Sequence, residues 1–143
     1  GKLGAIEGMI LVDTDLWIDF FSGSDPGASA VEMLLQERRA LLSVISAFEL
    51  FCGVRKKGQQ EQIESLLRVV PPIDLAKGAA FHAANHYKRL SKAGSLIGNQ
   101  DLLLAGTALE YRLPILTRNR KHFERIPTLE VISPEQLLAQ STS

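Results

Sequence analysis

Short apolar runs alternate with segments of helical spacing along most of the chain. Each apolar run is bounded by polar residues, glycine or proline, which is typical of strands buried on both faces of a sheet. The predicted strands are residues 9–12, 40–45, 68–70, 114–117 and 129–132. The predicted helices are residues 16–21, 25–38, 47–57, 61–67, 75–92, 99–111 and 121–125, and a short helix that opens at residues 133–134. This alternation predicts a three-layer α/β/α domain with a central, mostly parallel sheet of four to five strands.

Capping residues mark several of the predicted helix starts. Asp25 followed by Pro26 is typical of a helix N-terminus, and Asp74 has the capping role before residues 75–92. Ser46 and Glu49 have the spacing of a capping box, in which the acidic side chain reaches back to the first turn. These signals predict that helices begin at or next to Asp25, Ser46 and Asp74.

Composition limits the class of protein. The chain has 143 residues, 45% of them hydrophobic, and a formal net charge of zero, which suits one globular domain and argues against a general binder of polyanions. The single cysteine, Cys52, excludes an internal disulfide framework and a four-cysteine zinc site. The longest charge-free run, residues 78–87, is too short to cross a membrane, so a cytoplasmic protein is expected.

The glycine-rich start of the chain differs in composition from the residues after it. Residues 1–8 carry three glycines and precede Met9 and the first apolar run, so they are expected to be an expression remnant. Residues 9–143 contain neither an internal repeat nor a low-complexity linker, and we expect them to form a single domain.

Four polar side chains fall at the predicted carboxyl ends of strands or in a first helical turn. They are Asp13, Glu49, Asp101 and Asn119. Parallel α/β sheets bind their ligands at this edge, beside helix N-termini, so these four are candidate site residues. Residues 9–54 hold seven acids and two bases, whereas residues 112–125 hold five bases and one acid. An acidic pocket with a basic rim suits a cation together with a phosphate-bearing substrate.

The three acids of this set are candidate metal ligands. Carboxylates that converge repel one another unless a cation neutralises them, and oxygen donors favour hard ions such as Mg²⁺ or Mn²⁺ over zinc. Each acid also has a structural explanation, because Glu49 suits the capping box, Asp101 suits the positive end of a helix dipole, and Asp13 can cap the helix that follows it. The residue pattern leaves both explanations open.

Three segments of the chain, in this order and spacing, carry a family pattern. They are residues 9–21 (MILVDTDLWIDFF), residues 43–54 (SVISAFELFCGV) and residues 101–123 (DLLLAGTALEYRLPILTRNRKHF). These segments resemble the PIN-domain nucleases, and within them the VapC-type ribonuclease toxins of toxin–antitoxin pairs. The resemblance covers nearly all of residues 9–132 and implies a PIN-like fold.

The resemblance also implies an activity and partners. The activity is metal-dependent cleavage of RNA, with Asp13, Glu49 and Asp101 as the metal-binding acids and Mg²⁺ or Mn²⁺ as the cofactor. Asn119 stands where many relatives have a fourth Asp and joins the catalytic set, although its amide brings no charge. The usual partner is a VapB-like antitoxin that plugs the active site, and such toxins are typically homodimers.

On the same resemblance we assign roles around the expected site. Asp13 and Asp101 are expected to hold the ion, directly or through water, and Glu49 to orient or deprotonate the attacking water. Hydroxyl and basic side chains nearby are expected to hydrogen-bond a carboxylate or a phosphate oxygen, or to contact the RNA backbone. These substrate-binding residues are Thr14, Thr117, Arg118, Arg120 and Lys121.

Two other functions remain open at this point. Val12-Asp13-Thr14-Asp15 imitates the nucleophile and the acid–base residue of a haloacid-dehalogenase-like phosphatase, which forms an aspartyl phosphate. A PIN-like RNA-binding or regulatory module that has lost cleavage is the second alternative, because Asn119 lacks the charge of an Asp.

Other candidate features have simpler explanations. His82 and His86 stand four residues apart, a spacing that can bind one metal ion, but no third ligand is evident. Cys52 lies among apolar residues and is expected in the core. The aromatic side chains within residues 17–21 have the helical spacing of core or of a partner interface, and at least one is expected at an interface.

Overall fold

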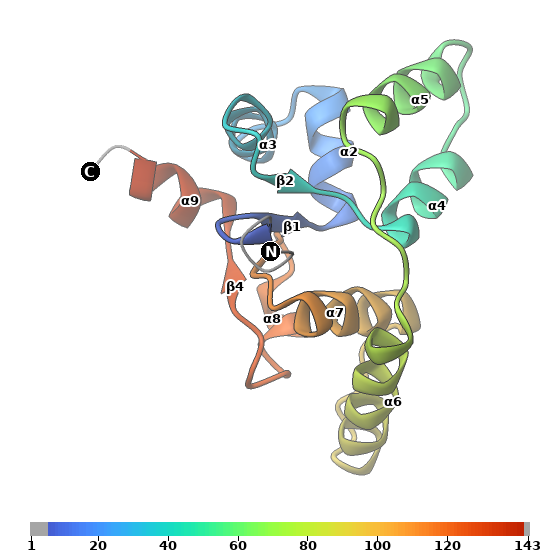
Figure 1. The fold of residues 1–143 in the computed structure, drawn as a ribbon, viewed down its shortest axis with the longest axis vertical. Coiled ribbons are helices and arrows are strands. Elements are labelled where there is room, and N and C mark those ends of the chain that lie inside the picture. The colour runs from blue at the N-terminus through green and yellow to red at the C-terminus, as the bar shows by residue number, and fades with distance from the viewer. Residues whose placement is uncertain (1–5, 142–143) are drawn as a thin grey trace.

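The computed structural model describes residues 6–141, which form a parallel sheet covered by helices on both faces (Figure 1). Within these residues the strands are β1 (Ile10–Val12), β2 (Ala40–Leu41), β3 (Ile115–Leu116) and β4 (Val131–Ile132). Their order is β2-β1-β3-β4, and every neighbouring pair is parallel. Residues 1–5 of the expected expression remnant and residues 142–143 lie outside the described part.

Helices follow and connect the strands. They are α2 (Thr14–Ser22), α3 (Gly27–Gln36), α4 (Val44–Cys52), α5 (Gln59–Val69), α6 (Lys77–Lys92), α7 (Asn99–Tyr111), α8 (Arg120–Phe123) and α9 (Pro134–Ser141). Each parallel strand pair is therefore joined through helical segments, as a parallel sheet requires. None of the helices in the described range 6–141 is both long and apolar enough to span a lipid bilayer.

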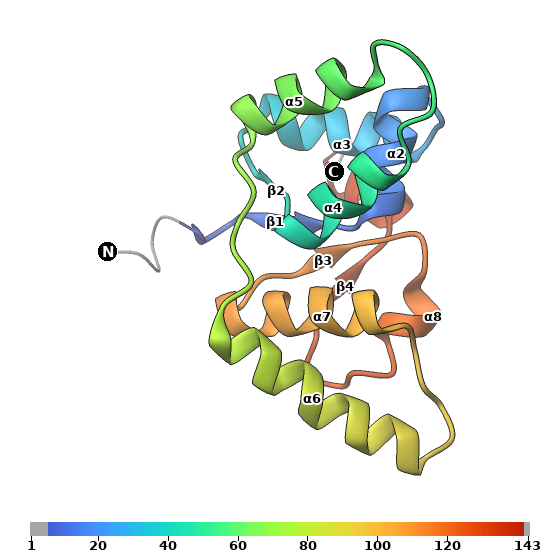
Figure 2. The ribbon, with the colours of Figure 1, turned by 90° about the vertical axis from the view of Figure 1, so that its right-hand side faces the viewer.

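Two hydrophobic cores lie on opposite faces of the sheet because successive strand residues point in opposite directions. Ile10 and Val12 contribute to the core shared with α2, α3, α4, α5 and α9, whereas Leu11 and Ile115 contribute to the core shared with α6, α7 and α8. Figure 2 shows these two groups of helices on either side of the strands. The predicted three-layer α/β/α architecture is confirmed, and its central strands β1 and β3 are buried on both faces, whereas the edge strand β4 is half-buried.

The strand predicted over residues 40–45 is shorter in the structure. Only Ala40 and Leu41 pair with β1, and α4 begins at Val44. The Ser43 hydroxyl accepts a hydrogen bond from the Ser46 backbone N–H at 3.1 Å, so Ser43 is the N-cap of α4. The predicted capping box starting at Ser46 is therefore wrong, and its acidic residue lies in the interior of the helix, free for another role.

Further boundaries differ from the predictions, three of them at a predicted strand or helix cap. The strand predicted over residues 68–70 is wrong, because α5 continues to Val69. Leu66 of this helix and Val70 directly after it are buried. Helix α6 begins at Lys77, and Asp74 lies outside it without the predicted capping role. Helix α3 begins at Gly27, although Asp25 still accepts the backbone N–H of Ser29 at 2.9 Å.

Helices α6 and α7 lie in close contact at Gly106. A Cβ added to Gly106 would overlap the backbone carbonyl oxygen of Ala79 and would lie 3.2 Å from the backbone nitrogen of Ala83, both on α6. Backbone atoms inside a helix cannot move aside without shifting the helix. A Cβ added to Gly78 of α6 would instead meet the side chain of Glu110, whose carboxylate end is free to rotate.

Gly106→Ala is therefore expected to lower the free energy of unfolding by about 1–3 kcal/mol, the usual effect of inserting a methyl group into filled space. Gly78→Ala adds the same Cβ on the facing helix and is expected to change stability by less than about 1 kcal/mol, because Ala favours the helix and Glu110 can move. Urea denaturation followed by circular dichroism measures both variants. If Gly106→Ala and Gly78→Ala are equally stable, α6 and α7 can move apart at Gly106 without loss of stability.

Candidate active site

Asp13 lies at the carboxyl end of β1 and is the N-cap of α2. Its backbone N–H donates to the Leu116 carbonyl at 2.9 Å, which joins it to β3. Asp13 Oδ1 accepts the Thr14 backbone N–H at 2.8 Å, and Asp13 Oδ2 accepts the Thr117 hydroxyl at 2.7 Å. The expected capping role of Asp13 is thus present, but its second oxygen is held by a residue from the far end of the chain.

Burial raises the pKa of Asp13 from its ordinary 3.8 to about 7. The hydrogen bond from Thr117 lowers the pKa, but the negative charges of Asp101 and Asp15 raise it further, and the Thr14 N–H compensates only in part. With a relative exposure of 6%, the Asp13 carboxylate has little water to stabilise its charge. A cation beside it would stabilise the ionised form.

Glu49, in the middle of α4, is joined to Asp13 through Thr14. The Thr14 hydroxyl donates to Glu49 Oε1 at 2.8 Å and lies 2.8 Å from the Ser46 hydroxyl. Because the single Thr14 proton goes to the carboxylate, Ser46 must donate to Thr14. Thr14 therefore connects α2 with α4, and it orients one oxygen of Glu49 while the other stays available.

Asp101 lies in the first turn of α7, as expected from the sequence. Its Oδ2 atom is 3.1 Å from His122 Nδ1, and the same ring nitrogen is 2.7 Å from the Asn119 side-chain amide. The Asn119 backbone N–H donates to the Thr117 hydroxyl at 2.9 Å, which ties this group to Asp13. His122 was missed by the sequence analysis, although its position three residues after Asn119, one helical turn away, could have indicated it.

Asp13, Glu49 and Asp101, named here the acid cluster, lie at one edge of the sheet with Thr14, Thr117, Asn119 and His122 around them. Within residues 6–141, no three His, Cys, Asp or Glu side chains are arranged as a complete metal-binding group. The acids are instead engaged with hydroxyl and imidazole groups. The chemistry of the donors still fits Mg²⁺ or Mn²⁺, because all three acids supply oxygen and a cation would stabilise the ionised form of the buried Asp13.

Two of the three basic residues expected to bind RNA have acidic neighbours in this structure. Arg118 Nε is 2.9 Å from Asp19 Oδ2, and Arg120 Nε is 2.9 Å from Glu124 Oε1. Lys121 is exposed. Asp19, on α2, was also missed by the sequence analysis, because its partner Arg118 comes from the distant segment after β3. The contacts of Arg118, Arg120 and Lys121 with RNA stay predictions.

The histidine pair and the cysteine do not join the site. His82 Nε2 is 3.4 Å from Glu110 Oε2, whereas His86 Nδ1 lies 3.1 Å from the Arg89 guanidinium, so the two rings have different partners. Burial and the charges of Arg89 and His82 lower the pKa of His86. Cys52 is exposed at the end of α4, and its predicted place in the core is wrong because the core side of that helix carries Leu50 instead.

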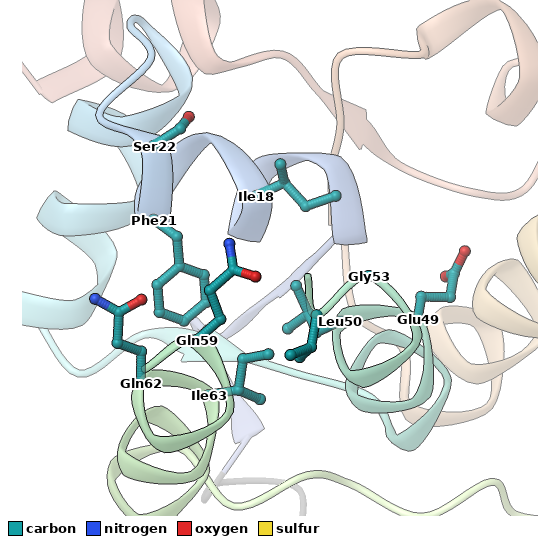
Figure 3. Close-up of a pocket in the computed structure, with 10 residues that line it drawn as sticks. Ile18, Phe21, Ser22, Glu49, Leu50, Gly53, Gln59, Gln62 and Ile63 are labelled. Carbon is teal, nitrogen blue, oxygen red and sulfur yellow. The ribbon is translucent and has the colours of Figure 1, made fainter. Parts of the chain in front are cut away.

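A groove of about 270 Å³ lies between α2, α4 and α5 and ends at Glu49 (Figure 3). Its apolar lining comes from Ile18, Phe21, Leu50, Val54 and Ile63, and its polar lining from Ser22, Glu49, Gln59 and Gln62. Ile18 is 48% exposed, which is unusual for a large apolar side chain. Of the aromatic group at 17–21, Trp17 is fully buried in the core, whereas Phe21 lines this groove.

Comparison with known proteins gives consistent matches over most of the chain. The family model for the PIN domain matches residues 10–129. Ribonuclease VapC1 of Methanocaldococcus jannaschii is 31% identical over 125 residues, which cover 87% of this chain and 86% of that protein. Ribonuclease VapC of Rickettsia bellii is 32% identical over 134 residues, with 87% of this chain and 95% of that protein covered.

Solved structures show the same fold. A toxin–antitoxin complex from Klebsiella pneumoniae contains a chain that matches with a TM-score of 0.70 and 26% identity, over 87% of this chain and 97% of that one. A chain of VapBC2 from Rickettsia felis, bound to a DNA fragment from its promoter, matches with a TM-score of 0.73 and 23% identity, over 87% and 98%. With the family model matching residues 10–129 and relatives more than 30% identical over most of their length, the chain belongs to the PIN domain family, in its VapC group.

Proposed function

We propose that this chain is a metal-dependent endoribonuclease and acts as the toxin of a toxin–antitoxin pair. The observation that carries the proposal is Asp13, a buried carboxylate whose raised pKa and whose neighbour Asp101 call for a cation at this point. Relatives support an RNA substrate, since they include a tRNA(fMet)-specific endonuclease VapC from Salmonella typhimurium, 29% identical over 68% of this chain. Mg²⁺ or Mn²⁺ is the proposed cofactor, and the cytoplasm the proposed location.

Each side chain of the site has a proposed task. Asp13 and Asp101 hold the ion, and a bound divalent ion supplies charge neutralisation for attack on the phosphodiester. Glu49 Oε2 takes a proton from the attacking water, because Oε1 is already occupied by the Thr14 hydroxyl. Thr117 keeps Asp13 in place.

The proposed substrate contacts surround this centre. Arg118, Arg120 and Lys121 bind the RNA backbone, which gives affinity with little sequence selection. The guanidinium group of Arg118 is held by Asp19, and that of Arg120 by Glu124. Because these side chains are already ordered, they lose less conformational entropy when they bind RNA.

The proposed cleavage is tested with total cellular RNA and freshly purified, antitoxin-free protein, in the presence of Mg²⁺, Mn²⁺ or EDTA. Discrete products that require a metal ion support the proposal, and the sequence of their ends identifies the target RNA. RNA that binds but stays intact under all conditions supports the alternative of a cleavage-deficient RNA-binding module. Because the chain belongs to the PIN domain family, the phosphatase alternative is set aside.

A VapB-like antitoxin is the proposed protein partner, since similar folds were solved as toxin–antitoxin complexes. The groove between α2, α4 and α5 is the proposed binding surface, because an apolar antitoxin segment that lies along Ile18 and Ile63 would reach Glu49 and cover it. The homodimer expected from the sequence stays a prediction.

Ile18→Arg is expected to weaken binding of the cognate antitoxin by about tenfold or more, because a charged side chain would be buried against Phe21 and Ile63. Val69→Arg is the matched control, since Val69 is 76% exposed and does not line the groove. Isothermal titration calorimetry with the antitoxin measures both variants. If both variants lose affinity to a similar extent, or if neither does, the antitoxin does not bind in this groove.

A further inference from the structure

Each carboxylate of the acid cluster has one oxygen close to a side chain from another part of the fold. Threonine hydroxyls donate to Asp13 Oδ2 at 2.7 Å and to Glu49 Oε1 at 2.8 Å. For Asp101 the corresponding group is His122 Nδ1, 3.1 Å from Oδ2. The threonines already have proposed tasks, whereas His122 has none.

The two neighbours of His122 Nδ1 decide its role. An ionised carboxylate only accepts hydrogen bonds, so the ring nitrogen beside Asp101 must carry a proton. The Asn119 side-chain nitrogen Nδ2 lies 2.7 Å from the same ring nitrogen. Because a nitrogen that already bears a proton cannot accept one from Nδ2, a proton on His122 Nδ1 requires a half-turn of the Asn119 amide, which exchanges the places of Nδ2 and Oδ1.

We propose that His122 is a positioning residue, whose Nδ1–H holds Asp101 Oδ2 and leaves Oδ1 to face the metal ion. Asn119 acts through this ring: after the half-turn its amide oxygen faces Nδ1, and its backbone N–H donates to the Thr117 hydroxyl at 2.9 Å. Groups that orient a ligand in this way typically change metal affinity by 10–100-fold when they are removed. This inference rests on the proposed function, because it presumes that Asp101 binds a metal ion.

Two substitutions of His122 distinguish a hydrogen bond from Nδ1 from one made by Nε2. In His122→Asn, the side-chain nitrogen Nδ2 takes the place of Nδ1, because both are bonded to Cγ. In His122→Gln, the amide nitrogen lies one bond further out, at the place of Nε2. His122→Ala removes the ring, and thermal denaturation checks that all three variants are folded, as expected for a side chain that is 38% exposed.

The affinity for Mn²⁺ alone, measured at one fixed pH by electron paramagnetic resonance, tests the inference. The unchanged protein and His122→Asn are expected to bind Mn²⁺ within about threefold of each other, whereas His122→Gln and His122→Ala bind about 10–100-fold more weakly. Equal affinities in all four proteins, or His122→Asn as weak as His122→Ala, would overturn the positioning role. A nitrogen coupling to the bound Mn²⁺ that disappears in His122→Ala would also overturn it, because His122 would then be a ligand.

If the proposed metal site itself is absent, the binding experiment gives a different result from the one expected if only the role of His122 is wrong. If the unchanged protein binds Mn²⁺ no more tightly than Asp13→Asn does, the metal site itself is absent, and the role of His122 is overturned with it. Tight binding that depends on Asp13 but not on His122 overturns only the positioning role.

Discussion

Asp13→Asn and Asp101→Asn are each expected to reduce RNA cleavage by about 10²- to 10³-fold or more, the scale on which an active site loses rate when one electrostatic group is removed. Asn has nearly the shape of Asp, so the hydrogen bonds around both positions can be kept in part. What disappears is a negative charge that holds the metal ion. Initial rates of cleavage of a labelled RNA, in saturating Mg²⁺ or Mn²⁺, measure the effect.

Asp15→Asn is the matched control for this experiment. Asp15 lies two residues after Asp13 on the same helix, and it is exposed. Its removal changes the local charge by the same amount without taking a side chain from the acid cluster, so near-normal cleavage is expected. Undiminished metal-dependent cleavage in Asp13→Asn and Asp101→Asn would mean that another group of residues carries the reaction.

The stability of the metal-free protein is expected to fall by about 4 kcal/mol on account of Asp13 as the pH rises from about 4 to about 7. The carboxyl has a pKa of about 7 in the folded chain and 3.8 as its ordinary value. Between these values the folded state keeps a proton that the unfolded state has released, so each pH unit lowers the free energy of unfolding by about 1.4 kcal/mol. Below pH 4 and above pH 7 this contribution is constant.

Comparing the unchanged protein with Asp13→Asn isolates the contribution of Asp13 from that of other titrating groups. The variant is expected to lose this pH dependence and to be the more stable of the two at pH 8 without metal. Adding Mg²⁺ or Mn²⁺ at pH 8 is expected to stabilise the unchanged protein, because its ionised Asp13 can bind the ion. The same addition is expected to leave the stability of Asp13→Asn unchanged. Urea denaturation across the pH range measures these differences, and parallel curves for the two proteins would mean that burial does not raise the pKa of Asp13.

The strand end that carries Asp13 could be predicted from the sequence, because an apolar run followed by a polar residue indicates burial directly. The start of α4 could not, since Ser43 and Ser46 both have capping chemistry and the residues between them suit a strand equally well. Only contact with the rest of the fold makes Ser43 the cap. The same limit applies to Cys52, whose apolar neighbours in sequence lie on a different side of the helix.

Contacts between distant segments could not be predicted from local sequence patterns, because they depend on the order of the strands in the sheet. The hydrogen bond from Thr117 to Asp13 joins residues 104 positions apart and exists because β1 and β3 are neighbours in the sheet. The order β2-β1-β3-β4 cannot be read from spacing alone, so Asp19 and Arg118 could not be paired in advance. His122 is the exception, because its distance from Asn119 is a single helical turn.

The placement of β3 beside β1 also bears on how the protein is made. Asp13 leaves the ribosome well before Thr117, which follows it by 104 positions. A nascent or prematurely terminated chain that ends before β3 lacks the strand that orders Asp13. For the proposed nuclease, activity therefore requires translation to pass β3, and chains that end earlier are expected not to attack the RNA of the cell that makes them.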